Sequence, residues 1–117
     1  MPHRIIWFDL AVRDLERAMA FYRAVLATDV KEEFEGVGVI SHDQGDVAGC
    51  LYVSDTYEPS KHGALLYFNV DGRLEHAVQQ VTDHGGEIEQ PAHEIGPFGR
   101  RAVAIDSEGN RIVLHSG

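Results

Sequence analysis

The chain has 117 residues, of which 44% are hydrophobic and 25% charged, and its formal net charge is −9. The length suits one domain, and the composition is that of a globular protein and not of a disordered one. The acidity argues against nucleic acid as a partner, because phosphate binding needs clustered basic residues and only Arg100 and Arg101 form a basic pair.

Membrane and secretory functions are not expected either. The N-terminal stretch 1–12 contains Asp9 and lacks the long apolar run of a secretory signal. No segment approaches the roughly 20 apolar residues that span a bilayer. Cys50 is the single cysteine, which rules out an intrachain disulfide and fits a reducing cytoplasm.

The first half of the chain predicts a strand, a helix and three further strands. Residues 4–12 are rich in β-branched and aromatic residues, and Asp14 follows at the position of a helix N-cap. Short strands are then expected at 30–35, 37–42 and 47–53. The helix between them shows one apolar stripe, made of Leu15, Ala18, Met19, Tyr22, Val25 and Leu26.

The second half repeats this order after a polar linker. Segment 54–63 contains Pro59 and separates the two halves. A short amphipathic helix is expected from Leu74 to Val81, ended by the glycine pair that follows it. Strands are predicted at 64–70, 87–93, 100–106 and 111–116, the last two joined by a hairpin turn over 107–110.

The repeated order indicates an internal duplication. A four-stranded sheet covered by one helix leaves a face and an edge unpartnered, and a second such unit can cover both. We therefore predict an α+β fold of two tandem βαβββ modules, 1–54 and 62–117, joined by linker 55–61 and forming a curved mixed sheet around a cleft. The alternative is a generic α+β domain with chance similarity. The matched positions are Val12 with Val70, Leu15 with Leu74, and Gly45 with Gly109.

Three segments carry a resemblance to a known family. They are "VRDLERAMAFYRAVL" at 12–26, "YFNVDG" at 67–72 and "DSEGNRIVLHS" at 106–116. They resemble the vicinal oxygen chelate superfamily, which includes glyoxalase I, bleomycin-resistance proteins, extradiol dioxygenases and fosfomycin-resistance enzymes. The resemblance implies paired modules around a cleft and, for a single-domain member, a homodimer.

The resemblance also implies where a metal would bind. In the metalloenzymes of this family, ligands stand on the first and last strands of each module, at positions that correspond here to Trp7, Gly49, Leu65 and Val113. None of these side chains suits a divalent cation, and a one-residue slip to Cys50 would not restore the pattern. We expect no cofactor, and a divalent metal only through non-standard ligands, as the bleomycin-resistance branch also lacks the metal.

Strand alternation extends the candidate site from these four positions. Asp9 accompanies Trp7, Tyr67 and Asn69 accompany Leu65, His115 accompanies Val113, and Leu51 accompanies Gly49. Asp9 and His115 are the candidate catalytic groups. The alternatives are a structural hydrogen bond of Asp9 to the backbone or to Tyr67 and a solvated terminal position for His115.

A turn-rich loop between two strands supplies three further candidates. Glycines and a proline frame Phe98 in the segment 93–101, and loops on a rigid scaffold often carry binding residues. Glu94, Phe98 and Arg100 are expected to close over the cleft, unless the loop is only a wide hairpin.

Three functional hypotheses follow. The first is metal-independent binding of a small organic molecule, with a flat ligand stacked on Trp7 and Tyr67 and held by Asp9; the acidic chain favours a neutral or cationic ligand. The second is a lyase, isomerase or dioxygenase that uses a relocated metal on Asp9 and His115, or metal-free acid–base chemistry. The third is a non-catalytic dimerising protein with a filled cleft.

Overall fold

The computed structural model describes residues 3–117, and its elements follow the predicted order twice. The first module forms a sheet of strand order β1-β4-β3-β2, and the second a sheet of order β5-β8-β7-β6. The elements are β1 (Trp7–Val12), α1 (Leu15–Leu26), β2 (Val30–Phe34), β3 (Val37–Ile40), β4 (Ala48–Val53), β5 (Tyr67–Asn69), α2 (Leu74–Asp83), β6 (Glu87–Glu94), a 3-10 turn (Gly96–Phe98), β7 (Arg100–Ile105) and β8 (Arg111–Ser116).

The two sheets share one topology. In each, the first strand pairs in parallel with the last, and the other neighbours are antiparallel. Val12 ends β1 and Val70 directly follows β5, while Leu15 and Leu74 begin the two helices. The α+β fold of two βαβββ modules is therefore confirmed. The sequence pattern repeats because each half of the chain forms one of these modules.

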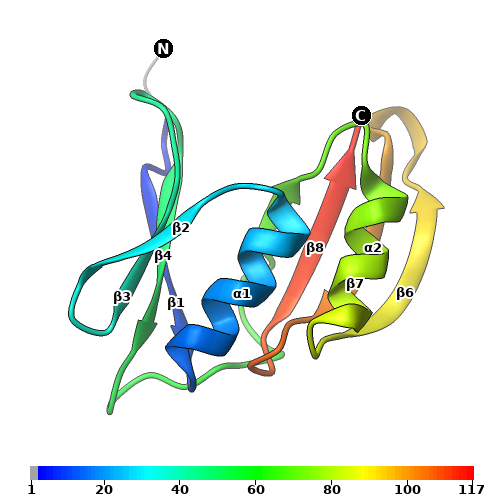
Figure 1. Ribbon diagram of the computed structural model, residues 1–117. Coiled ribbons are helices and arrows are strands. Elements are labelled where there is room, and N and C mark those ends of the chain that lie inside the picture. The colour runs from blue at the N-terminus through cyan, green and yellow to red at the C-terminus, as the bar shows by residue number, and fades with distance from the viewer. Residues whose placement is uncertain (1–2) are drawn as a thin grey trace.

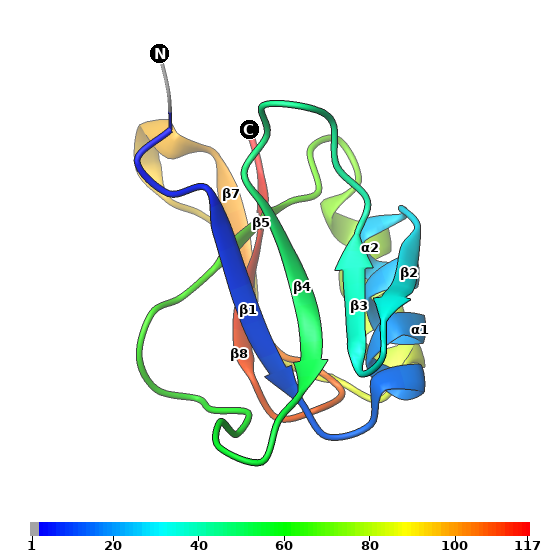
Figure 2. The ribbon, with the colours of Figure 1, turned by 90° about the vertical axis from the view of Figure 1, so that its left-hand side faces the viewer.

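The sheets remain separate and are joined through their helices. No strand of one sheet pairs with a strand of the other within residues 3–117. Figure 1 shows the first sheet on the left, the second on the right, and α1 beside α2. The connecting segment passes around the β1 edge of the first sheet to reach β5 (Figure 2). Neither helix of this part of the chain is long and apolar enough to cross a membrane.

Both helices start as their sequences predict and bury one face. Asp14 caps α1 by accepting a hydrogen bond from the backbone N–H of Arg17 at 3.1 Å. Arg73, at the start of α2, donates to the carbonyl of Val25 at 2.6 Å and so satisfies the carboxyl end of α1. The buried faces meet in a single core that includes Phe21, Tyr22, Val25, Leu51, Phe68, Leu74, Val81, Ile112 and Leu114.

The turn between β7 and β8 reaches the first module through one buried carboxylate. The side chain of Glu108 is fully buried, and one of its oxygens accepts from the backbone N–H groups of Arg13 and Asp14, each at 2.8 Å. The other oxygen accepts from Arg17 Nε at 2.7 Å. These donors surround the amino end of α1, where N–H groups lack helical partners and negative charge is favourable. Glu108 thus fastens the second module to the first helix.

Two further residues of the same turn strengthen the connection. Asn110 donates through Nδ2 to the carbonyl of Ala11 at 2.9 Å, and the hydroxyl of Tyr22 donates to Asp106 at 2.6 Å. Burial and the Asp106 carboxylate raise the pKa of Tyr22, so its hydroxyl keeps the proton that it donates. Among the described residues, no buried side-chain nitrogen or oxygen lacks a partner.

The Glu108 clamp predicts acid-dependent stability. Burial by itself raises the pKa of Glu108, but hydrogen bonds from Arg17 and from the backbone of Asp14 and Arg13 outweigh it and hold the pKa below the usual glutamate value. The clamp therefore contributes fully above the unfolded-state pKa of about 4.3 and is lost as the pH falls through the lower folded-state pKa.

We expect Glu108→Gln to lower the free energy of unfolding by about 1–3 kcal/mol at pH 7, because it removes the charge from these hydrogen bonds. Urea titrations at a series of pH values should show the difference from the wild type shrinking below pH 4. Glu33→Gln, at an exposed strand position, is the control and should change stability little at any pH. A difference that stays constant down to pH 2 would contradict the clamp.

Candidate functional site

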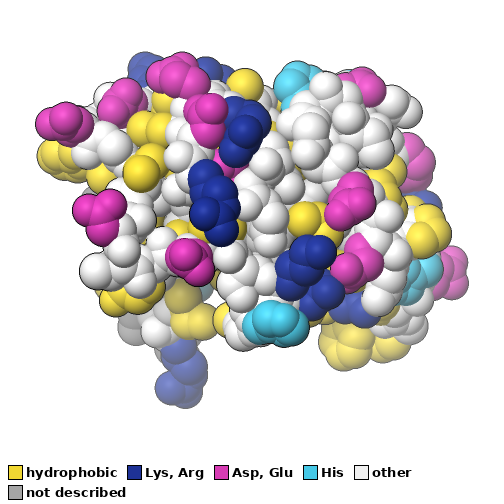
Figure 3. Space-filling model, turned by 90° about the horizontal axis from the view of Figure 1, so that it is seen from below, with side chains coloured by type: hydrophobic (Ala, Val, Ile, Leu, Met, Phe, Trp, Pro, Cys, Tyr) yellow, Lys and Arg dark blue, Asp and Glu magenta, His cyan; other side chains and the backbone are white. Residues whose placement is uncertain are grey.

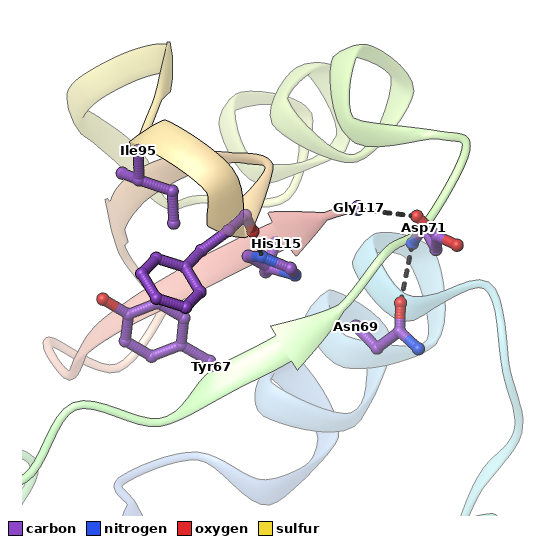
Figure 4. Close-up of a pocket in the computed structure, with 7 residues that line it drawn as sticks. Tyr67, Asn69, Asp71, Ile95, His115 and Gly117 are labelled. Carbon is purple, nitrogen blue, oxygen red and sulfur yellow. Dashed lines mark hydrogen bonds between the residues drawn. The ribbon is translucent and has the colours of Figure 1, made fainter.

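A cavity of about 660 Å³ lies on the face of the second sheet that points away from α2. Tyr67 and His115 come from the neighbouring strands β5 and β8, and Ile95 lies above them on the loop after β6 (Figure 4). The lining residues are Tyr67, Asn69, Asp71, Ile95, Phe98, His115 and Gly117. The structure therefore brings together four of the predicted site residues: Tyr67, Asn69, Phe98 and His115.

His115 has a defined orientation in this cavity. Its Nε2 lies 2.5 Å from the carbonyl oxygen of Phe98, and a carbonyl can only accept, so Nε2 carries the proton. In the neutral ring, Nδ1 is then the nitrogen with a lone pair. His115 is thus anchored to the loop above the cavity and not a solvated terminal side chain, and Nδ1 is left as a base or acceptor.

Backbone constraints at Gly99 hold the loop 95–99 over β8. Gly99 adopts φ +96°, and a Cβ there would collide with the carbonyl oxygen of Ser116. The backbone N–H of Ile95 donates to the carbonyl of Gly99 at 2.9 Å and closes the loop. As a result Phe98 projects its ring, 73% exposed, beside the cavity.

Asp71 and Asn69 form the opposite end of the cavity. Asp71 Oδ1 accepts from the backbone N–H of Gly117 at 2.7 Å and from Ser116 Oγ at 3.1 Å, which holds the end of β8 in place. The backbone N–H of Asp71 donates in turn to Asn69 Oδ1 at 2.8 Å. Alternation beyond Tyr67 and Asn69 leads directly to Asp71, so this was a residue that the strand pattern could have identified.

Trp7 and Asp9 form a separate cluster on the first sheet. Asp9 Oδ1 accepts from Trp7 Nε1 at 2.8 Å and from the thiol of Cys50 at 3.2 Å. Asp9 also lines a second cavity of about 450 Å³ between β1 and the connecting segment. Asp9 and His115 therefore line different cavities of this chain. Asp9 accepts its structural hydrogen bonds from Trp7 and Cys50 and not from the expected partners, the backbone or Tyr67.

The predicted orientation of Gly49 and Leu51 is wrong. Leu51 is fully buried in the core, and a Cβ at Gly49 would collide with the ring of Phe8, which packs on that core. Cys50 instead shares the face of Asp9, with which it is in register. The cause is one extra residue between the turn glycine and the last strand of the first module, which makes Cys50, not Gly49, the counterpart of Val113.

Four other predicted residues do not line the cavity. Leu65 is 41% exposed and precedes β5, but it does not line the cavity of the second sheet. Glu94 pairs in register with Arg100, whose guanidinium contacts Glu75 on α2, so both residues lie toward the helix side of the sheet. Val113 is fully buried beneath the cavity floor, in register with Tyr67.

Comparison with known proteins agrees with this architecture. Residues 4–114 match the family model described as Glyoxalase/Bleomycin resistance protein/Dioxygenase superfamily. The chain belongs to this superfamily. No curated protein matches the chain significantly.

Solved structures of the superfamily share the fold. A glyoxalase/bleomycin resistance protein from Albidiferax ferrireducens T118 superposes with a TM-score of 0.78 at 19% identity, covering 98% of this chain and 100% of that chain. A family enzyme from Burkholderia phytofirmans PsJN gives 0.76 at 20%, covering 94% and 95%. The fosfomycin resistance protein FosX from Mesorhizobium loti gives 0.70 at 18%, covering 100% and 93%. At these identities the likeness shows the fold alone.

The donor set of this glyoxalase-superfamily chain does not fit the metal that the family resemblance implies. Trp7 and Val113 offer no ligand atom, and no group of three or more His, Cys, Asp or Glu side chains within residues 3–117 is arranged to hold an ion. Burial, followed by the hydrogen bond and charge of Asp9, raises the pKa of Cys50 to about 11, which opposes the thiolate that metals bind.

The Cys50 environment predicts low thiol reactivity. At pH 8 we expect iodoacetamide to alkylate the folded protein on the order of a hundredfold more slowly than the urea-unfolded chain, because so little thiolate forms. Asp9→Asn should raise the rate only part of the way, since burial is the larger cause and remains. Asp71→Asn is the matched control. Equal rates in folded and unfolded protein would contradict this assignment.

Proposed function

We propose that the chain binds a small organic molecule in the cavity of the second sheet, without a metal. The observation that carries this proposal is the pairing of two exposed rings with a polar floor. Tyr67 is 51% exposed and Phe98 73%, and both border the cavity, whereas Asn69, Asp71 and His115 present polar atoms to it. A volume of about 660 Å³ is typical of small-molecule sites.

The rings determine the kind of ligand. Aromatic side chains left exposed beside a cavity offer flat apolar faces that favour stacking with a planar or aromatic group. The polar residues of the floor fix the orientation of that group. Trp7, which we expected to stack as well, lies on the other sheet and uses its indole N–H to hold Asp9.

Metal-free acid–base chemistry is the second candidate, and the geometry of His115 favours it. Its Nε2 proton is committed to the carbonyl of Phe98, which leaves Nδ1 as the basic nitrogen of the cavity. The version with a relocated metal on Asp9 and His115 has less support, because these two side chains line different cavities.

A fragment screen tests the binding proposal. Planar aromatic fragments at saturating concentration should raise the melting temperature by several degrees, because they bind only the folded chain. Phe98→Ala should weaken the best fragment about three- to tenfold, as the loss of one aromatic contact predicts. Phe34→Ala removes a phenylalanine that is also exposed, at 69%, but lies on the first sheet, and should leave the affinity unchanged.

Metal analysis of the same protein distinguishes metal-independent binding from binding that needs a metal. If the purified chain carries stoichiometric metal and fragment binding disappears on chelation, the metal-independent proposal fails. If no fragment binds the wild type, or if Phe34→Ala weakens binding as much as Phe98→Ala, the cavity of the second sheet is not the site.

We also propose that two copies associate in the cytoplasm. The free thiol of Cys50 fits a reducing compartment. The segments that lead into β1 and β4 expose apolar side chains: Ile5 is 67% exposed, Ile6 73% and Val47 45%. An apolar surface of this kind is typical of a contact with another protein chain, and the homodimer expected from the family resemblance would cover it.

Light scattering after size-exclusion chromatography should therefore give twice the mass of one chain at micromolar concentration. Ile6→Glu should shift the equilibrium toward the monomer at least tenfold, because it places a charge in the apolar contact. Phe34→Glu is the control on the far hairpin of the same sheet and should leave the mass unchanged. A monomeric wild type at the highest soluble concentration would contradict the association.

A further inference from the structure

A row of polar side chains crosses the whole second sheet at the edge of the cavity. The strand register places Asn69 opposite His115, His115 opposite Arg101, and Arg101 opposite His93. The row lies on the same face as Tyr67, since the guanidinium of Arg101 donates to the Tyr67 hydroxyl at 2.5 Å and lies 5.9 Å from the centre of its ring. Arg101 therefore places a cationic group against Tyr67, which lines the cavity.

The positive charge of Arg101 is not neutralised by its neighbours. Arg101 Nε donates to His93 Nε2 at 3.2 Å, so that nitrogen is an acceptor without a proton. His93 Nδ1 lies 2.8 Å from the carbonyl of Pro91 and donates to it. His93 is thus a neutral imidazole that orients the guanidinium, and the Tyr67 phenol is neutral as well.

Arg101 differs from the other arginines in its surroundings. Arg17, Arg100 and Arg111 each contact a carboxylate at 2.7–2.9 Å. Arg23 and Arg73 donate to backbone carbonyls instead. Arg101 likewise takes part in no ion pair within residues 3–117, but it contacts Tyr67, which lines the cavity. Figure 3 shows acidic and basic side chains interspersed on one face of the molecule. A half-buried arginine without a carboxylate beside a cavity has the properties of a receptor for an external anion.

The remaining donors of Arg101 match an oxyanion. Two of its five N–H groups are used by His93 and Tyr67, which leaves three on the guanidinium fork. The hydroxyl of Tyr67 accepts from Arg101, so its own proton is available to a second acceptor. The Asp71 carboxylate at the other end of the cavity disfavours an anion there and gives the ligand a direction.

We propose that this site takes an anionic ligand, whose carboxylate or phosphoryl group binds Arg101 and the Tyr67 hydroxyl while its flat apolar part lies beside Phe98 and Ile95. This inference rests on the proposed binding function of the same cavity. The net charge of −9 suggested a neutral or cationic ligand. We replace it by an anionic one, because a charge beside the cavity affects the ligand more strongly than the distant, screened charges of the rest of the chain.

Three naphthalene probes of similar shape test the proposal on the full chain: 2-naphthoate, 2-naphthyl phosphate and the neutral 2-naphthamide. Dissociation constants come from NMR titrations of backbone amides, and the shift changes must include residues 67, 98 and 115. We expect at least one of the two anions to bind the wild type about tenfold or more tightly than the amide. The anion with the lower dissociation constant shows whether the site prefers a planar carboxylate or a tetrahedral phosphoryl group.

Two arginine variants locate the effect. Arg101→Gln should remove the preference for the anion, so that the dissociation constants of the anion and of 2-naphthamide come within about twofold of each other. Arg100→Gln is the matched control. Arg100 is next to Arg101 in the sequence, but its guanidinium pairs with Glu75 on the opposite face of the sheet, so this variant should keep the preference for the anion. Arg101→Lys should retain part of it through charge alone.

The outcomes separate the two proposals. If 2-naphthamide binds at the cavity as tightly as both anions, the anion inference is overturned and the binding function stands. If Arg100→Gln removes the preference and Arg101→Gln does not, the inference is likewise overturned. If none of the probes shifts the cavity residues, the proposed binding function fails together with it. Should Arg101→Gln not fold, the wild-type comparison of anion with amide still decides.

Discussion

Glu108 holds the two halves of the molecule in their relative positions. Its buried carboxylate comes from the second module and accepts hydrogen bonds at the start of α1 in the first, so neither sheet can rotate without leaving a charge and several N–H groups unsatisfied. Asn110 and Asp106 extend the same connection to Ala11 and Tyr22. The first residues of the motif that carried the family resemblance near the end of the chain thus form a structural joint, whereas His115 of the same motif lines the cavity.

This joint has a consequence for the cavity. Because the helices meet in a shared core, each sheet turns its other face outward, and those faces carry the exposed rings of Trp7 and Tyr67. The outward faces of the two sheets differ in structure. The first holds a closed cluster in which Asp9 is satisfied by Trp7 and Cys50. The second holds an open cavity bordered by the exposed rings of Tyr67 and Phe98.

The second face also shows how local electrostatics can oppose net charge. A chain with a formal charge of −9 still presents an arginine without a carboxylate at the edge of its cavity. Interactions between exposed charges fade beyond about 8 Å in physiological salt, so the ligand proposed for the cavity would respond mainly to Arg101 and Asp71. His93 acts as the neutral partner that keeps Arg101 oriented without reducing its charge. Whole-chain charge is therefore a guide to solubility and to excluded partners more than to the ligand of one site.

The sequence by itself determined the duplicated βαβββ order and the Asp14 cap of α1, because these depend on local periodicity and turn chemistry. Strand alternation, counted from the ligand positions that the family resemblance implies, led to the cavity residues Tyr67, Asn69 and His115, and the turn-rich loop led to Phe98. Tertiary structure decided the rest. One extra residue before β4 moved Gly49 and Leu51 to the core side, and a shift of one residue reverses every side chain of a strand. Whether Arg101 meets a carboxylate, and whether Asp9 meets His115, depends on contacts between strands far apart in the chain, which no local pattern specifies.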